Sequence, residues 1–217
     1  MRYHRGMVLA PTERDVLLVV DVQNDFLSGG ALAVPDADAV VSVINRLATR
    51  FAHVVLTQDW HPAGHGSFAS SHPGKVSFDT ITLAYGTQVL WPDHCVQGTR
   101  GAEFSASLAI ARAELVLRKG YRHDVDSYSA FCEADRATRT GLAGYLRERG
   151  LVRVFLAGLA TDFCVAWSAA DAVDAGFAAV VVEDACRAID TGGSLAAAWA
   201  RMREAGVARV TTHEFDG

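Results

Sequence analysis

The chain has 217 residues, of which 50% are hydrophobic and 21% are charged, and its formal net charge is −5 at pH 7. This length supports one substantial hydrophobic core, so a single domain fits better than two. Charged residues of both signs are interspersed without a basic run, which argues against nucleic acid or an anionic membrane as a partner. No apolar run reaches the ~18 residues that a membrane-spanning helix needs.

The N-terminal segment Met1–Arg14 lacks the apolar core of a signal peptide. We interpret residues 1–14 as an extension that precedes a single domain over residues 15–217. The four cysteines are scattered and include no CxxC pair: Cys95, Cys132, Cys164 and Cys186. We therefore expect a cytoplasmic protein whose thiols are reduced.

In chain order, short apolar segments alternate with segments of helical periodicity. The predicted strands are Asp15–Val20, His53–Thr57, Glu114–Leu117, Val152–Leu156, Ala178–Val182 and Ala208–Val210. The predicted helices are Asp36–Phe51, Glu103–Ala113, Thr138–Arg149, Asp162–Ala175 and Ser194–Ala205. Apolar strands that alternate with helices predict an α/β fold with a parallel sheet covered on both faces. The stretch Trp60–Gly101 is too long for an ordinary connection, so we expect it to be functional.

Reactive side chains follow the first four predicted strands. Asp21, Asp59 and Lys119 come at or just beyond the ends of the first three, and Cys164 follows the fourth. Parallel sheets of this kind bind ligands beyond the carboxyl ends of their strands, so these side chains should meet at one edge. Taken singly, each residue has an ordinary alternative: Asp21 could cap a turn, and Lys119 could be solvated.

The stretch Val154–Val165, VFLAGLATDFCV, predicts a buried strand, a tight turn and a helix with Cys164 in its first turn. Thr161 would cap this helix, and its unpaired N–H groups and dipole would favour a thiolate. For a lone cysteine, a buried packing role is about twice as common as a reactive one.

The neighbouring strand ends change this balance. An ammonium at Lys119 would stabilise the thiolate, and a carboxylate at Asp21 could accept its proton and return it to a leaving group. The Leu159-Ala160 turn could direct backbone N–H groups at a developing oxyanion. The chemistry indicated is acyl transfer, in which a carboxamide is attacked and ammonia leaves.

The long stretch contains candidate metal ligands. Asp59 and His61 stand at positions i and i+2 of an extended segment, and His94 lies in a Trp-Pro-Asp-His turn. This mixed oxygen and nitrogen set suits one divalent ion such as Zn, Fe or Mn. His65 is either a further ligand or a hydrogen-bonding loop residue, and both interpretations stay open. Flat aromatic side chains such as Phe26 and Trp91 suit a flat ring substrate, although core packing is the default for either one.

Five segments resemble nicotinamidases/pyrazinamidases of the isochorismatase-like cysteine hydrolase superfamily. They are DVQNDF (Asp21–Phe26), QDWHPAGHGSFAS (Gln58–Ser70), WPDHCVQGT (Trp91–Thr99), RKGYRHDVDSYSAF (Arg118–Phe131) and GLATDFCV (Gly158–Val165). They span most of the chain in the family's order. The resemblance implies a three-layer α/β/α fold with a six-stranded parallel sheet. It also implies hydrolysis of nicotinamide, and of pyrazinamide, in pyridine nucleotide salvage.

The resemblance implies roles position by position. Asp21, Lys119 and Cys164 match the catalytic triad, and the amides of Ala160, after a cis peptide bond, and Cys164 match the oxyanion hole. The family's metal ligands, with zinc the favoured ion, match Asp59, His61 and His94. His65 matches a ligand of some members only, and the aromatics that enclose the pyridine ring match Phe26 and Trp91.

Other activities fit less well. An isochorismatase needs no cysteine nucleophile, so Cys164 argues against it. Carbamoylsarcosine and ureidoacrylate hydrolases generally lack the metal motif that Asp59, His61 and His94 match. A non-catalytic binding module or a thiol redox sensor would not require the complete triad. The sequence favours neither a monomer nor a homo-oligomer, and the only partner it predicts is the small-molecule substrate.

Overall fold

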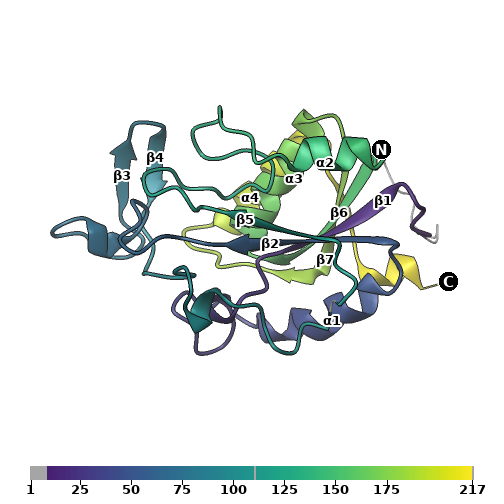
Figure 1. Cartoon of the computed structure of the whole chain (residues 1–217), viewed down its shortest axis with the longest axis horizontal. Coiled ribbons are helices and arrows are strands. Elements are labelled where there is room, and N and C mark those ends of the chain that lie inside the picture. The colour runs from purple at the N-terminus through teal and green to yellow at the C-terminus, as the bar shows by residue number, and fades with distance from the viewer. Residues whose placement is uncertain (1–8, 110, 217) are drawn as a thin grey trace.

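The computed structural model describes residues 9–109 and 111–216. Six parallel strands form one twisted sheet in the order β5-β2-β1-β6-β7-β8 (Figure 1). Their bounds are β1 Asp15–Val20, β2 His53–Asp59, β5 Leu115–Lys119, β6 Arg153–Leu159, β7 Ala178–Arg187 and β8 Ala208–Val210. The predicted six-stranded parallel sheet is confirmed.

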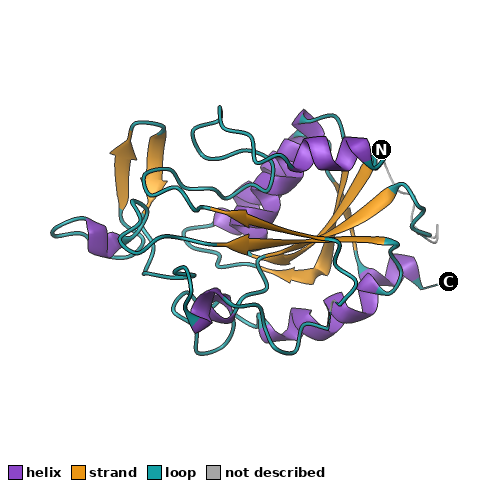
Figure 2. Ribbon diagram, in the orientation of Figure 1, coloured by secondary structure: helices purple, strands orange, loops and turns teal. Residues whose placement is uncertain are grey.

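Helices cover both faces of the sheet and make the three layers visible in Figure 2. Helix α1 (Asp38–Ala48) packs on one face, and α2 (Leu142–Glu148), α3 (Ala166–Asp174) and α4 (Ser194–Glu204) pack on the other. All six residues of β1 are buried because successive side chains point to opposite covered faces. Leu17 packs in the cluster with α1, and Leu18 packs in the cluster with α2, α3 and α4.

The strand order reverses between β1 and β6. From β1 the chain adds β2 and then β5 on one side, and it returns to add β6, β7 and β8 on the other. The two helices that follow β1 and β6 therefore lie on opposite faces, which leaves a crevice at the carboxyl ends of these two strands. Gly158 lies at this point with φ +124°, and a Cβ there would overlap the backbone of Val20, so only glycine permits the close approach.

The predicted helix over Glu103–Ala113 is wrong for the described residues, and Ile110 lies outside them. The segment instead pairs with the chain just after β1: Asn24 donates to the Glu103 carbonyl, and Ser105 donates to the Val22 carbonyl, both at 3.0 Å. These bonds to a distant segment replace the local bonds that a helix would make.

The long stretch after β2 contains an unpredicted hairpin, β3 (Thr80–Leu83) and β4 (Gly86–Val89). It stands at the end of the molecule to which the strands of the sheet point (Figure 1). Four-residue strands carry too little periodicity to stand out in the sequence.

The helix expected over Asp162–Ala175 begins differently. Thr161–Val165 forms a π-helical turn, in which Val165 donates to the Ala160 carbonyl at 3.1 Å, and α3 follows. The residue at the N-terminal cap position of this turn is Ala160, and Thr161 lies within the turn, so its predicted role as helix cap is wrong. Within residues 9–109 and 111–216, no helix is both long and apolar enough to cross a membrane.

Candidate active site

Four neighbouring strands deliver the reactive side chains to one buried place. Asp59 and Lys119 are the last residues of β2 and β5, Asp21 follows β1, and Cys164 lies in the turn after β6. Because these strands are adjacent and parallel, their carboxyl ends lie side by side, as the sequence predicted. The four side chains are each at most 6% exposed.

The Lys119 ammonium is the centre of this cluster. It lies 2.8 Å from Asp21 Oδ2, contacts the Asp59 carboxylate, and donates to the Ser127 carbonyl at 2.9 Å. Its Nζ is 3.4 Å from the Cys164 Sγ. Burial opposes a charge on Lys119, but electrostatic attraction by the carboxylates of Asp21 and Asp59 outweighs it and holds the pKa of Lys119 well above its usual range. The side chain is therefore a cation at physiological pH.

Asp21 is held in place by contacts to both of its carboxylate oxygens. Thr57 Oγ1 donates to its Oδ1 at 2.6 Å, and its Oδ2 lies 2.8 Å from the Lys119 Nζ. One of its oxygens also lies within 4.8 Å of the Cys164 Sγ. Burial raises the pKa of Asp21 and outweighs the attraction of Lys119. A carboxyl group with a raised pKa is a better proton acceptor than an ordinary aspartate, so this environment suits a general base.

The resting state of Cys164 differs from the sequence-based expectation of a thiolate. Burial raises the pKa of the Cys164 thiol well above its usual value, and the nearby Asp21 and Asp59 raise it further, while Lys119 lowers it only in part. The expectation gave weight to the unpaired N–H groups and dipole of a helix start and to the Lys119 ammonium. It did not include the cost of burying a thiolate next to the carboxylates of Asp21 and Asp59. The thiol is therefore neutral at physiological pH.

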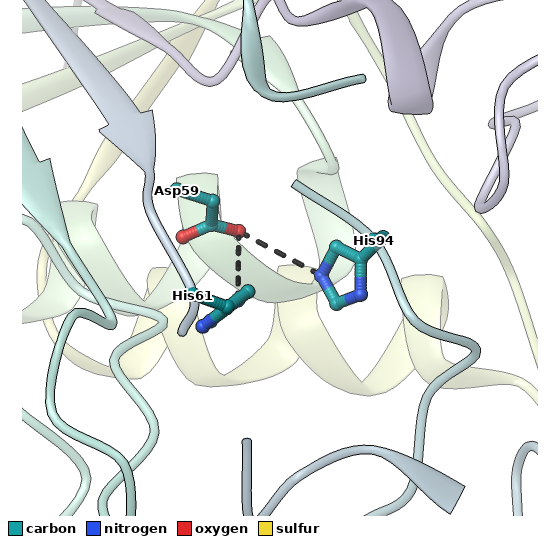
Figure 3. A group of neighbouring side chains, drawn as sticks. All are labelled: Asp59, His61 and His94. Atoms are coloured by element: carbon teal, nitrogen blue, oxygen red, sulfur yellow. Dashed lines mark ion pairs between the residues drawn. The ribbon is translucent and has the colours of Figure 1, made fainter. Parts of the chain in front are cut away.

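The ligand atoms of Asp59, His61 and His94 lie within 4.8 Å of one another. Figure 3 shows the two histidine rings beside the Asp59 carboxylate. The Nε2 atoms of His61 and His94 lie 3.7 and 3.9 Å from Asp59 Oδ2. Each ring places its other nitrogen on a backbone carbonyl: His61 Nδ1 on that of Gly120 at 2.8 Å and His94 Nδ1 on that of Pro92 at 2.9 Å. When Nδ1 donates, the lone pair of Nε2 faces the shared space.

Burial and mutual contacts shift the pKa of all three side chains. Burial lowers the pKa of His94 to about 4, so its ring is neutral at physiological pH. Burial opposes ionisation of Asp59, but Lys119 and the two histidines outweigh it and lower the pKa of the carboxyl group. Gly120 makes room for this arrangement because a Cβ there would collide with the His61 ring. Burial opposes protonation of His61, but its contact with Asp59 outweighs this and raises its pKa, so His61 gives up a proton when a metal binds. One carboxylate and two imidazoles fit a divalent metal ion.

His65 lies beside these three residues but makes other bonds. Its ring centroid is 4.4 Å from that of His61. Its Nδ1 accepts from the Ser67 N–H at 3.2 Å, and its Nε2 lies 3.4 Å from the Val125 carbonyl. His65 forms a second group of neighbouring ligand atoms with His61 and Asp126 rather than with Asp59 and His94. Its role as a ligand stays a prediction.

A pocket with an empty volume of about 340 Å³, partly open to solvent, lies above the thiol. Phe26 and Trp91, which the sequence singled out, both line it, together with Ala160, Asp59, His61, His94 and Cys164. Trp91 donates from Nε1 to the Tyr128 hydroxyl at 3.0 Å, and its ring packs edge-on to Phe163 at 4.8 Å between centroids. The peptide bond between Leu159 and Ala160 is cis, as the resemblance implied.

Sequence reasoning missed several residues of this pocket: Leu32, Asp126, Tyr128, Phe163 and Ile189. Tyr128 and Asp126 lie in the RKGYRHDVDSYSAF segment and Phe163 lies in GLATDFCV, so the matched motifs contained the only available signal. Leu32 and Ile189 lie outside every matched motif. The remaining cysteines, Cys95, Cys132 and Cys186, are buried and unpaired, and burial raises the pKa of each.

A family model described as "Isochorismatase domain" matches residues 15–215. The chain belongs to the isochorismatase family. Among relatives in this family, a nicotinamidase of Acinetobacter baylyi is 58% identical over 199 residues, which cover 92% of this chain and 93% of the relative.

Solved structures of the isochorismatase fold agree with this one. The structure described as an Acinetobacter baumanii nicotinamidase and pyrazinamidase is 57% identical, with a TM-score of 0.93 over 94% of this chain and 98% of its own. PnC1 of L. infantum in complex with nicotinate is 39% identical, with a TM-score of 0.84 over 96% and 98%. A Pyrococcus horikoshii pyrazinamidase in complex with zinc is 33% identical, with a TM-score of 0.74 over 91% and 99%.

Proposed function

We propose that this protein is a nicotinamidase, which hydrolyses nicotinamide to nicotinate and ammonia through a thioester on Cys164. One observation carries the proposal: the Cys164 thiol lies 3.4 Å from the Lys119 ammonium, which also holds Asp21 at 2.8 Å, at the base of an aromatic pocket. Relatives named nicotinamidase at 58% and 44% identity support the same activity, and the L. infantum relative binds the expected product, nicotinate.

In the first half-reaction, Asp21 takes the proton from Sγ while the sulfur attacks the carboxamide carbon. The negative charge that develops on the carbonyl oxygen faces the backbone amides of Ala160 and Cys164. Lys119 stabilises the thiolate as it forms and keeps Asp21 in place. Asp21 then gives the proton to the amide nitrogen, the C–N bond breaks, and ammonia leaves the acyl group on the sulfur.

In the second half-reaction, Asp21 takes a proton from water, whose oxygen attacks the thioester carbon. The C–S bond breaks, nicotinate is released, and the proton returns to the Cys164 sulfur. A neutral resting thiol suits this cycle. The sulfur keeps its proton until Asp21 removes it in the first half-reaction, and it recovers a proton from Asp21 at the end of the second.

The metal site is proposed as one divalent ion held by Asp59, His61 and His94, with zinc as the ion and with Fe and Mn as alternatives. The donor set and the zinc in the Pyrococcus horikoshii pyrazinamidase support zinc. When bound, the ion would anchor the ring nitrogen directly or through a water molecule. Phe26 and Trp91 are proposed to enclose the ring, and His65 is proposed as a fourth ligand in a state in which it leaves its bonds to Ser67 and Val125.

We also propose pyrazinamide as a substrate, since the Acinetobacter baumanii protein is described as a pyrazinamidase too. The unpaired cysteines fit a reducing compartment, so we propose the cytoplasm as its location. We propose that residues 15–217 fold as one domain.

The test is ammonia release from nicotinamide by the purified chain with Zn²⁺ supplied. We expect steady turnover by the wild type and none by a Cys164→Ala variant that folds normally by circular dichroism. Equal release by both proteins would refute a thioester mechanism, and no release by the wild type would refute the proposed activity.

A further inference from the structure

Asp162 is a buried carboxylate close to the nucleophile that the proposed mechanism does not use. It lies two residues before Cys164 and is 4% exposed. Its Oδ1 accepts a hydrogen bond from the Ile189 N–H at 3.1 Å, and its Oδ2 accepts from the Asp190 N–H at 2.8 Å and from the Ser194 hydroxyl at 2.5 Å. All three donors lie in or at the end of the connection between β7 and α4.

This connection adopts a conformation that depends on partners elsewhere in the fold. Asp190, Gly192 and Gly193 have φ values of +50°, +58° and +81°, in the left-handed region that side chains with a Cβ seldom adopt. Hydrogen bonds to a charged acceptor are roughly twice as strong as neutral ones. The Asp162 carboxylate therefore ties this connection to the turn that carries the nucleophile.

Ile189 links the hydrogen bonds of Asp162 to the pocket. Ile189 lines the pocket together with Phe163 and Cys164, whereas Asp162 does not line it. Since Asp162 Oδ1 holds the Ile189 N–H, the position of this apolar wall relative to the thiol depends on the carboxylate.

We propose that Asp162 is a positioning residue that sets the Ile189 wall of the ring pocket, and that it thereby controls ring binding and the size of ring substituents that the pocket admits. The proposal rests on the proposed function, in which a pyridine ring occupies this pocket. Three donors converge on one carboxylate, so an asparagine would turn an NH₂ group toward at least one of them and loosen the connection.

The experiment measures kcat and KM of the full zinc-supplied enzyme for nicotinamide and for 5-methylnicotinamide. For Asp162→Asn we expect KM for nicotinamide to rise about tenfold with kcat within about threefold, since ring binding and not the chemical step is weakened. The preference for nicotinamide over the methylated ring should fall. Ile189→Ala should act in the same direction, and the double variant should be no worse than the more severe single variant, because both changes remove the same wall.

Two further measurements separate positioning from general loss of structure. Asp184→Asn is the matched control: this carboxylate also accepts from a backbone N–H and a hydroxyl, both of Thr212, but lines no part of the pocket. Its KM and preference should equal those of the wild type. The rate at which iodoacetamide alkylates Cys164, followed on the Cys164 peptide by mass spectrometry, needs no ring and should be unchanged in Asp162→Asn.

If Asp162→Asn fails to fold, Ser194→Ala removes one of the three bonds and should raise KM in the same direction by about twofold. The proposal would be overturned if Asp162→Asn lowered kcat with KM unchanged, or if it slowed the alkylation of Cys164. It would also be overturned if the effects of Asp162→Asn and Ile189→Ala on KM multiplied in the double variant. An inactive wild type would refute the proposed function and this inference together, whereas an active wild type with an unchanged substrate preference in Asp162→Asn would refute this inference alone.

Discussion

Replacing Lys119 by methionine should destabilise the protein more than any ordinary surface change. The side chain is 1% exposed, and its ammonium pairs with the buried carboxylates of Asp21, at 2.8 Å, and of Asp59. Methionine keeps most of the length and apolar surface of the lysine stem but removes the charge. The Lys119→Met variant therefore leaves two buried carboxylates without their shared cation.

The distance sets the size of the effect. At an effective dielectric constant of about 20, unit charges 2.8 Å apart attract each other by about 6 kcal/mol. Part of this loss is recovered because Asp21 can bind a proton in the variant. Breaking a buried pair by removing one partner typically costs about 3–5 kcal/mol, and we expect a loss of unfolding free energy in this range.

The loss should also depend on pH. Burial already raises the pKa of Asp21 beside Lys119, and removing the cation raises it further. A carboxyl group whose folded pKa lies above its unfolded value of about 3.9 binds more protons in the folded state, so stability falls as pH rises between the two values, by about 1.4 kcal/mol per pH unit. The variant should therefore lose more stability than the wild type as the pH rises toward neutrality.

Urea unfolding followed by circular dichroism, with chelator present and from about pH 5 to pH 8, measures both effects. Lys75→Met is the matched control, since Lys75 is the only other lysine of the chain and is exposed. It should behave as the wild type. A loss below about 1 kcal/mol in Lys119→Met, with a pH profile parallel to that of the wild type, would show that Lys119 does not neutralise these carboxylates.

The remaining predictions concern the nucleophile, the metal and the loss of stability at low pH. Cys164→Ala should lose turnover but still bind nicotinate by calorimetry, and loss of both would place the defect in folding or in the pocket. His94→Ala should bind at least tenfold less zinc by elemental analysis after dialysis, and wild-type zinc content would remove His94 from the ligand set. Burial opposes ionisation of Asp15, but Arg153 and Thr12 outweigh it and lower the pKa of its carboxyl group, so its contribution is present above the unfolded pKa and is lost as pH falls through the folded one. Asp15→Asn should therefore lower the unfolding free energy at neutral pH and make it fall less steeply as the pH is lowered. Urea unfolding at acidic pH with the same slope as the wild type would contradict this.

Much of the sheet was predictable because each strand is a short apolar run that is buried on both faces. The bounds of β1 and β8 agree with the prediction at both ends. The segment Glu103–Ala113 was not predictable, because two of its backbone hydrogen bonds go to residues that follow β1, some 80 positions earlier. Local periodicity contains no information about such distant partners.

The sequence by itself determined which reactive groups the site contains, since strand ends, Asp-x-His spacing and the matched motifs are local features. Only the tertiary structure decided how these groups behave. It buried Cys164 between two carboxylates and one cation, so the thiol rests in its neutral form and not as the thiolate that a helix start suggested. It also brought Ile189 to the wall of the pocket through the Asp162 carboxylate. Burial and contacts between distant segments set these properties, and neither is written in the order of neighbouring residues.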